Sequence, residues 1–209
     1  MTPDQPFRIA VLASGEGTNL QAILDQLHRQ DGIAVVGVGS NKPGARALER
    51  GAADGVETAA FPVGEHEDRD ARDRAIGDWL DGLAIDLVVL AGYMELLSTE
   101  LVERFENRIV NVHPALLPSF PGLDAIGQAL EHGVRITGVT VHFVDAGVDS
   151  GPIILQRPVP VPLDRDRDAL EAAIHTTEHA LLPEAIRLIA AGRVRVDGRI
   201  VHISSASGT

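Results

Sequence analysis

The first half of the chain alternates between short apolar runs and stretches with helical periodicity. The apolar runs predict buried strands over residues 8–13, 33–39, 56–61, 85–91 and 108–112. In the intervening segments, apolar residues recur every three or four positions, as on one face of a helix. These segments predict helices over residues 19–30, 45–53, 68–83 and 99–105. Near-continuous apolar strands that alternate with helices are typical of a parallel sheet covered on both faces.

The pattern changes in the second half. Residues 113–123 are rich in proline and glycine, which predicts a loop. A helix over 125–132, strands over 136–144 and 153–161, a helix over 166–191 and a hairpin over 193–203 follow. The hairpin turns at Asp197-Gly198, a preferred pair for a tight β-turn. The fold class is therefore α/β, with a mostly parallel central sheet and a C-terminal hairpin, and no linker divides the chain.

Composition narrows the classes of function. The chain has 209 residues, 30 acidic and 18 basic, and a formal net charge of −12. Such a charge disfavours a surface that holds a nucleic-acid backbone. The absence of cysteine excludes disulfides and thiolate chemistry, and no apolar run approaches the roughly 18 residues of a membrane span. Residues 1–7 lack signal-peptide features. We therefore expect a cytoplasmic protein with small-molecule partners, without nucleic acid or membrane.

The loop after the first strand suits a phosphate. Residues 14–19 (SGEGTN) are small and polar and precede a predicted helix, whose N-terminal N–H groups and partial positive charge favour anions. The loop completes neither the dinucleotide fingerprint nor the nucleotide-triphosphate loop, so we expect no nucleotide cofactor. The alternative is a simple turn in which Thr18 or Asn19 caps the helix.

Asn111 and His113 are the first candidates for chemistry. They lie two residues apart at the end of a predicted parallel strand and so point to the same side. An amide can donate to a developing oxyanion, and an imidazole can exchange a proton near neutral pH. Alternatively, both side chains only satisfy backbone groups of the following loop.

Asp149 is the third candidate. It lies in the glycine-bounded loop 145–151, from which its carboxylate could stabilise His113 as the imidazolium. Asp145 in the same loop is the weaker choice, because it also suits a turn. His142 shares a strand face with Thr140 and is equally suited to a pocket or to the core.

Residues 175–179 (HTTEH) match a pattern found in zinc hydrolases. A third ligand should follow downstream, but Glu184 and Asp197 are the sole acids there. Glu184 is too close on the same helix, and Asp197 lies in the hairpin turn. We therefore expect no metal.

Several segments together resemble the folate-dependent formyltransferases. The superfamily signature is carried by residues 111–118 (NVHPALLP), 120–122 (FPG), 139–144 (VTVHFV) and 145–153 (DAGVDSGPI). Residues 14–21 (SGEGTNLQ), 90–94 (LAGYM) and 177–179 (TEH), with the total length, resemble the members that act on a glycinamide ribonucleotide. The resemblance covers nearly the whole chain.

The resemblance implies a three-layer Rossmann-like formyltransferase fold as a single domain over residues 1–209. A phosphate-binding half would span about 7–112, and a folate-binding and catalytic half about 113–203. It also implies transfer of the formyl group of 10-formyltetrahydrofolate to the amine of 5-phosphoribosylglycinamide in de novo purine biosynthesis. The formyl donor is a co-substrate, no metal or nucleotide cofactor takes part, and the protein would be a monomer or a homodimer.

Site residues carry over by motif. Asn111 and a protonated His113 would stabilise the oxyanion, and Asp149 would keep His113 charged. The residues implied for the ribonucleotide are Gly17, Thr18, Asn19 and Glu178. Those implied for the folate, partly through backbone groups, are Arg69, Met94, Glu95, Leu96, Leu97, Asn111, Val144, Asp145 and Asp149.

Three positions depart from the family's pattern. Asp124 stands where histidine is common, Glu95 where many members have arginine, and His175 where a basic or amide residue is frequent. The Glu95 change matters little if its folate contact is through the backbone, and puts folate affinity in doubt if the contact is through the side chain.

Three other functions remain as alternatives. A formyltetrahydrofolate hydrolase would use the same trio with water as acceptor, but it carries an additional N-terminal domain. A methionyl-tRNA formyltransferase has a C-terminal extension and binds tRNA, for which the charge of −12 is unsuitable. A non-enzymatic phosphate-binding module would leave Asn111, His113 and Asp149 unexplained.

Overall fold

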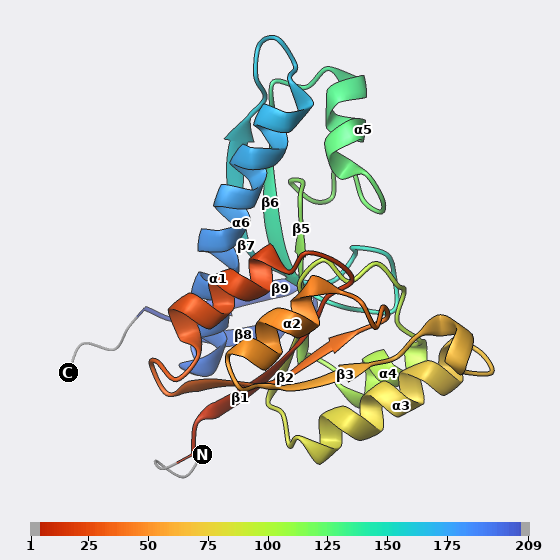
Figure 1. The fold of residues 1–209 in the computed structure, drawn as a ribbon. Helices are drawn as coiled ribbons and strands as arrows, with labels where there is room; N and C mark the ends of the chain where they lie inside the picture. Colours follow the sequence, from red (N-terminus) through yellow and green to blue (C-terminus); the bar gives the residue numbers. More distant parts are fainter. Residues whose placement is uncertain (1–4, 206–209) are drawn as a thin grey trace. The chain divides into compact units, whose positions relative to one another are not determined.

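The computed structural model describes residues 5–205 and divides the chain into two compact units, residues 1–110 and 111–209 (Figure 1). Each unit is described by itself. Within the described residues, the strands form a seven-stranded sheet of order β3-β2-β1-β4-β5-β6-β7 and a separate β8-β9 hairpin. The predicted α/β class, with a mostly parallel sheet and a C-terminal hairpin, is confirmed.

The first unit is built from βα repeats. Its elements are β1 (Phe7–Leu12), α1 (Thr18–Leu27), β2 (Ile33–Ser40), α2 (Arg46–Ala53), β3 (Glu57–Ala60), the 3₁₀ turn η1 (Val63–Glu65), α3 (Arg69–Gly82), β4 (Leu87–Leu90), α4 (Thr99–Arg104) and the start of β5 (Ile109–His113). Strand β1 pairs in parallel with β2 and with β4, and β2 pairs in parallel with β3. The apolar runs thus predicted both the strands and their direction.

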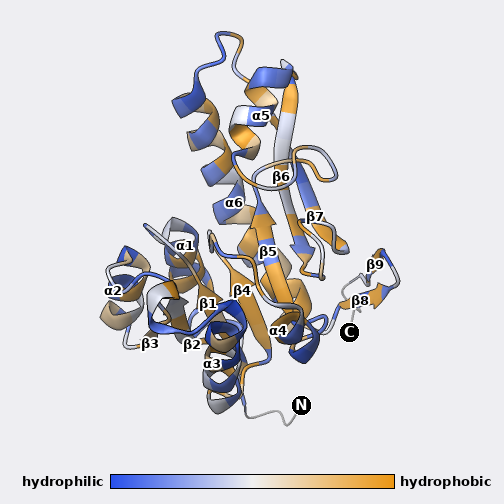
Figure 2. Ribbon diagram, turned by 90° about the vertical axis from the view of Figure 1, so that its right-hand side faces the viewer, coloured by the Kyte–Doolittle hydropathy of each residue, from blue (hydrophilic) through white to orange (hydrophobic). Residues whose placement is uncertain are grey.

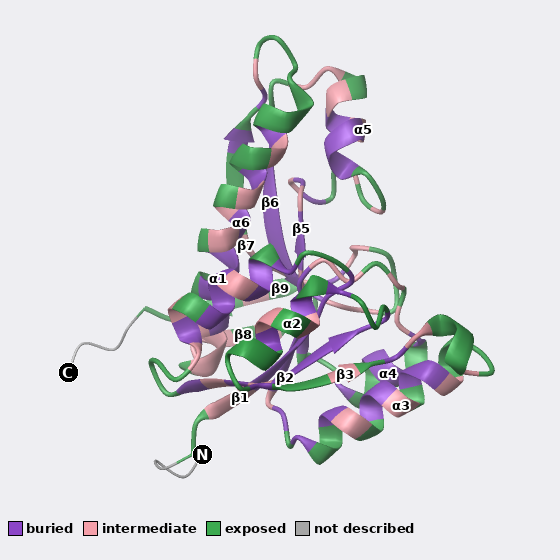
Figure 3. Cartoon of the chain, viewed as in Figure 1, coloured by how far each residue is buried: buried purple, intermediate pink, exposed green. Residues whose placement is uncertain are grey.

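Helices cover both faces of the first unit's sheet. On β2, Gly37 lies against Trp79 of α3 and against Leu83 just after that helix, whereas Val38 packs against Gly51 of α2. Because neighbouring residues of a strand point to opposite faces, α2 and α3 lie on opposite sides. Strands β1 and β4 between these layers are apolar and buried (Figures 2 and 3).

Helix α1 is shorter than predicted, ending at Leu27 rather than at residue 30. The His28 N–H donates to the Ile23 carbonyl, and Arg29 and Asp31 have left-handed backbone conformations, with φ of 60° and 51°. The chain therefore reverses directly into β2, after the last apolar position of the helix. The short turn η1 was not predicted.

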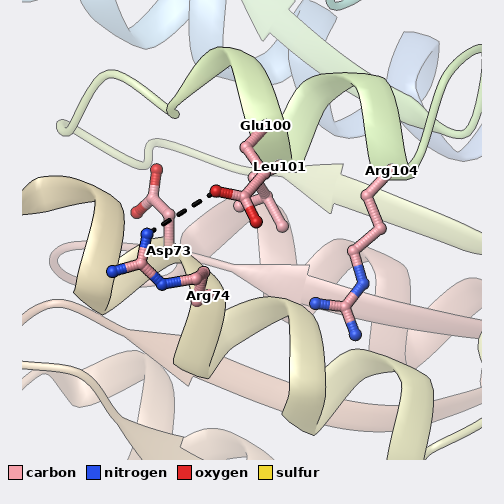
Figure 4. A pocket seen from close by; sticks show the side chains of 5 residues that line it. All are labelled: Asp73, Arg74, Glu100, Leu101 and Arg104. Atoms are coloured by element: carbon pink, nitrogen blue, oxygen red, sulfur yellow. Dashed lines mark ion pairs between the residues drawn. The ribbon is translucent and has the colours of Figure 1, made fainter.

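Helices α3 and α4 are joined by charged side chains. Ser98 caps α4 by accepting from the Leu101 N–H. Arg74 of α3 forms an ion pair with Glu100 of α4 at 3.6 Å (Figure 4). Arg104 of α4 pairs with Asp78 and Asp81 of α3. The indentation between the two helices is lined by Asp73, Arg74, Glu100, Leu101 and Arg104. Four of these five side chains are charged and all four are paired within the protein, so we assign no substrate to the indentation.

The second unit is an antiparallel ribbon backed by a long helix. After the end of β5 it contains α5 (Ala125–His132), β6 (Ile136–Phe143), β7 (Ile153–Pro160), α6 (Arg167–Ala190), β8 (Val194–Asp197) and β9 (Ile200–Ile203). Strands β6 and β7 pair antiparallel, and α6 packs on both. The loop between β6 and β7, over residues 144–152, carries the predicted Asp149. In the described part of the chain, no helix is both long and apolar enough to cross a membrane.

We predict that Gly37→Ala destabilises the fold by about 1–3 kcal/mol, the usual cost of overpacking a core. A Cβ at this position would lie 2.5 Å from Leu83 Cδ1 and 2.8 Å from a Trp79 ring atom. Urea unfolding measures the effect. Gly82→Ala is the matched control, because it ends α3 and a Cβ there meets nothing within 4 Å. Equal stability of the two variants would contradict the tight contact between β2 and α3.

Candidate active site

Strand β5 brings Asn111 and His113 to one side of its end. Both carry polar side chains, whereas Val112 between them is apolar and buried. Pro114 follows at once and has no N–H with which to extend the strand ladder. His113 is itself buried, at 4 % exposure. The predicted common orientation of the two side chains agrees with their shared contact to Asp149.

Asp149 reaches the same place from the loop between β6 and β7. Its φ of 50° is left-handed, a conformation in which aspartate is one of the tolerated residues. Asp145 folds the loop by accepting hydrogen bonds from the Gly147 N–H at 3.0 Å and the Ser150 hydroxyl at 2.7 Å. Asp145 thus forms the turn that the sequence suggested. The Gly122 N–H then donates to Asp149 Oδ2 at 2.8 Å.

The predicted trio forms one cluster around the Asp149 carboxylate. Asn111 Nδ2 donates to Asp149 Oδ1 at 3.3 Å, and His113 Nδ1 lies 3.3 Å from Oδ2. His142 joins them: its Nε2 lies 3.2 Å from Asn111 Nδ2 and 3.6 Å from Asp149 Oδ1. The sequence left His142 undecided between pocket and core. The structure places it in the cluster, where its ring contacts two members of the trio.

Both ring nitrogens of His113 face acceptors. Nε2–H donates to the Phe120 carbonyl at 2.8 Å, while Nδ1 faces the Asp149 carboxylate. A neutral imidazole has one N–H and can satisfy only one of these acceptors, whereas the imidazolium satisfies both. Hydrogen bonding therefore favours the cation.

Burial opposes that preference. It lowers the pKa of the His113 imidazole below its usual 6.5, although Asp149 and the Phe120 carbonyl act to raise this pKa. Burial alone would raise the pKa of the Asp149 carboxyl, but hydrogen bonds from His142 and Gly122 and the nearby His113 leave it below its usual value. In the unliganded protein the pair is therefore an anionic carboxylate beside a mainly neutral imidazole at pH 7. In the unliganded protein, desolvation outweighs the effect of the Asp149 carboxylate on the pKa of His113. The expectation that Asp149 keeps His113 charged during the reaction stays a prediction.

The first loop ends in a helix without a side-chain cap. Gly17 occupies the N-cap position of α1 with φ of 69°, and no side chain donates or accepts a capping hydrogen bond there. The alternative in which Thr18 or Asn19 caps the helix is therefore wrong. A side chain on Gly17 would meet Ala47 at 2.9 Å as well as straining the backbone. Thr18 is exposed and Asn19 is buried.

The first unit's predicted folate residues differ in accessibility. Met94 is 61 % exposed and Leu96 is 60 % exposed. Arg69 is exposed beside Asp70. Glu95 is turned inward, because its carboxylate contacts Arg72 and Asn41. The Leu97 side chain is half-buried.

In the second unit, the remaining predicted residues lie on the loop after β6 and on α6. Val144 is half-buried, and Glu178 is buried at 5 % exposure. The rings of His175 and His179 stack, with centroids 6.2 Å apart. Among residues 5–205, no group of three or more His, Cys, Asp or Glu side chains is arranged to hold a metal ion.

Asp124 has a structural role in this chain. In a left-handed conformation it caps α5 by accepting from the Gly127 N–H, and it forms an ion pair with Arg167 at 2.7 Å. The aspartate that departs from the family's histidine thus fixes the end of the loop before α5.

The fold and this cluster define a class of protein. Residues 7–186 match the model of the formyl transferase family, and the chain belongs to that family. The resemblance seen in the motifs is confirmed.

Similar proteins indicate which members of the family this chain resembles. The chain is 43 % identical over 197 residues to the phosphoribosylglycinamide formyltransferase of Mycobacterium tuberculosis, covering 94 % of this chain and 91 % of that protein. Glycinamide ribonucleotide transformylase 1 from Symbiobacterium toebii matches with a TM-score of 0.93 at 48 % identity, over 96 % of this chain and 95 % of that one. A formyltetrahydrofolate deformylase from Pseudomonas syringae matches with a TM-score of 0.90 at 26 % identity, over 97 % of this chain and 67 % of that one.

We predict that the pKa of His113 in the unliganded protein lies below 6.5 and falls further in Asp149→Asn. Removing the carboxylate removes a charge that raises this pKa, while the burial that lowers it stays. NMR titration of the ¹⁵N-labelled imidazole gives the value. Asp145→Asn is the control, because it changes the same loop without touching His113. A rise of the His113 pKa in Asp149→Asn would show that the carboxylate does not favour the imidazolium.

Proposed function

We propose that Asn111, His113 and Asp149 catalyse transfer of the formyl group of 10-formyltetrahydrofolate to the amine of 5-phosphoribosylglycinamide. The products are formylglycinamide ribonucleotide and tetrahydrofolate, in de novo purine biosynthesis. The observation that carries the assignment of residues is the convergence of an amide and an imidazole on one half-buried carboxylate. The similarity to named ribonucleotide formyltransferases over nearly the whole chain supports the choice of substrates.

The reaction is an acyl transfer. The substrate amine attacks the formyl carbon, a C–N bond forms, and the carbonyl electron pair moves onto oxygen to give a tetrahedral oxyanion. Asn111 stabilises this oxyanion by donating a hydrogen bond, and protonated His113 stabilises it by its positive charge. The intermediate collapses with cleavage of the bond between the formyl carbon and N10 of the folate. The attacking nitrogen loses a proton and N10 gains one, with Asp149 accepting and returning the proton directly or through water.

The cluster is suited to respond to a developing negative charge. The hydrogen bonds of Asn111 are 3.2 and 3.3 Å long, at the long end of the usual range, so exchanging one for an oxyanion costs little. Burial favours the neutral form of His113 before the reaction, and an adjacent oxyanion raises the pKa of its ring. The positive charge thus forms as the transition state forms, which is the condition for stabilising the transition state more than the substrate.

Substrate contacts are proposed residue by residue from the family's motifs. Gly17, Thr18 and Asn19 bind the ribonucleotide phosphate, which the uncapped N-terminus of α1 favours. Glu178 contacts the ribose or amide portion. The folate is assigned to Arg69, Met94, Glu95, Leu96, Leu97, Val144 and Asp145, together with Asn111 and Asp149.

We further propose that residues 1–209 form a single formyltransferase domain. Its phosphate-binding half would span about 7–112, and its folate-binding and catalytic half about 113–203. We also propose a cytoplasmic location, because the charged phosphate and folate substrates do not cross membranes unaided. A monomer or homodimer, acting without nucleic acid or membrane, remains the prediction for its assembly and partners.

We predict that purified protein consumes 10-formyltetrahydrofolate only when 5-phosphoribosylglycinamide is present. The absorbance change of folate deformylation follows the reaction. Parallel assays with and without the ribonucleotide separate the transferase from a hydrolase, for which water is the acceptor. Equal rates in the two assays would exclude the transferase and leave the first loop without its proposed ligand.

We predict that Asn111→Ala lowers kcat by about 10²–10³, the usual effect of removing one oxyanion donor. The KM for the ribonucleotide should change little, because the proposed phosphate contacts are untouched. Steady-state kinetics measures both constants. Asp197→Ala in the exposed β8–β9 hairpin is the control and should retain full turnover. Near-normal kcat in Asn111→Ala would remove this residue from the mechanism.

A further inference from the structure

Helix α3 buries two charged residues in succession near its start. Arg72 is 1 % exposed and Asp73 is fully buried. Long charged side chains are seldom fully buried unless they are paired. Arg72 Nη2 lies 2.8 Å from Asp73 Oδ1, and Nε donates to the same oxygen at 2.9 Å. This pair lies outside the catalytic cluster described above.

The other contacts of this pair hold the segment between β4 and α4, over residues 91–98. Arg72 Nη2 donates to the Leu96 carbonyl at 3.3 Å, and the Ser98 N–H donates to the Asp73 carboxylate. At the start of the segment, the Met94 N–H donates to the Ser14 hydroxyl at 2.8 Å. The backbone is therefore fixed at residues 94, 96 and 98 from inside the first unit.

Glu95 completes this arrangement. Its Oε2 lies 3.3 Å from Arg72 Nη1, and its Oε1 accepts from Asn41 Nδ2 at 2.9 Å. The Glu95 side chain is 34 % exposed, whereas the Arg72 side chain is 2 % exposed. Glu95 thus links its own backbone to α3 and to the end of β2.

The neighbouring phenol does not balance the charge of Arg72. Burial raises the pKa of Tyr93 to about 12, despite the nearby Arg72. Tyr93 is therefore neutral at physiological pH, and Asp73 and Glu95 are the anionic groups that contact the guanidinium. Because charge-assisted hydrogen bonds are stronger and more directional than neutral ones, the pair of Glu95 and Arg72 restrains the segment.

We propose that Glu95 and Arg72 are positioning residues for the formyl donor, which hold residues 94–97 in the conformation that binds folate. This inference rests on the folate-binding role proposed for residues 94–97. Glu95 stands where many members of the family have arginine, and an arginine here would place its charge against buried Arg72. Glu95 therefore pairs with Arg72 inside the protein and does not face the donor. Residues 94–97 present their backbone and the exposed side chains of Met94 and Leu96 to the donor.

Substitution of Glu95 tests the proposal without leaving a fully buried charge alone, because Arg72 keeps Asp73. In Glu95→Ala the segment must become ordered when the donor binds, so we expect the KM for 10-formyltetrahydrofolate to rise about tenfold. We expect kcat and the KM for the ribonucleotide to stay within about twofold, because neither Asn111 nor the first loop changes. Glu95→Gln keeps an acceptor for Asn41 and should recover part of the affinity.

Glu95→Arg discriminates between an internal and a ligand-facing role. It restores the family's common residue but places like charges together, so we expect a larger rise in the donor KM than in Glu95→Ala. A donor KM below that of the natural chain would overturn the inference. Glu100→Gln is the matched control, because Glu100 forms an exposed ion pair with Arg74, which lies on α3 as Arg72 does (Figure 4). This variant should leave both KM values unchanged.

Hydrogen exchange tests the positioning role of Glu95 and Arg72 separately from the folate-binding role of residues 94–97. We expect saturating tetrahydrofolate to slow amide exchange in residues 93–98 of the natural chain. Absence of this protection would refute the folate-binding role of the segment. Protection together with an unchanged donor KM in Glu95→Ala would refute the positioning role alone. A fall in thermal stability with no change in donor KM would also refute it, since the pair would then be only structural.

Discussion

The Asp149 carboxylate is the interaction on which the catalytic cluster depends. It receives an N–H from the loop after β5 through Gly122, an amide N–H from β5 through Asn111, and contacts from two imidazoles, His113 and His142. Its pKa stays low although burial acts to raise it. A carboxylate that is partly removed from water needs donors to remain charged, so the same contacts that keep Asp149 ionised also fix the positions of Asn111 and His113.

Opposing effects set the pKa of His113, and burial is the largest of them. Burial favours the neutral ring, whereas the carboxylate at Nδ1 and the Phe120 carbonyl at Nε2 favour the cation. Neither effect alone would make His113 a good stabiliser of the transition state. A permanently protonated ring would bind the substrate and the transition state alike. A neutral ring without the nearby carboxylate would stabilise an oxyanion only weakly. A negative charge that develops beside His113 raises the pKa of its ring, so the cation forms where it can stabilise the oxyanion.

Local patterns in the sequence predicted the parts of the fold that depend on them. Apolar runs gave the strands, and the residue types of Asn111, His113 and Asp149, with their motif, gave the trio. The role of His142 and the contact of Phe120 with His113 depend on where distant loops meet, which periodicity does not encode. Arg72 was missed although a signal existed: it precedes Ile76 by one helical turn and so lies on the buried face of α3. Because Arg72 is charged, the apolar pattern of the helix did not identify it as a buried position.

The two acidic departures from the family's pattern illustrate how position decides the effect of a substitution. Both Asp124 and Glu95 pair with an arginine of this chain, Arg167 and Arg72 respectively. Asp124 and Arg167 are exposed, where water and salt screen the pair, so it contributes little. Arg72 is buried, and removing its partners would leave charge in a medium of low dielectric constant. The ion pair of Glu95 and Arg72 is therefore the stronger restraint, and it acts at residues that the folate is proposed to contact.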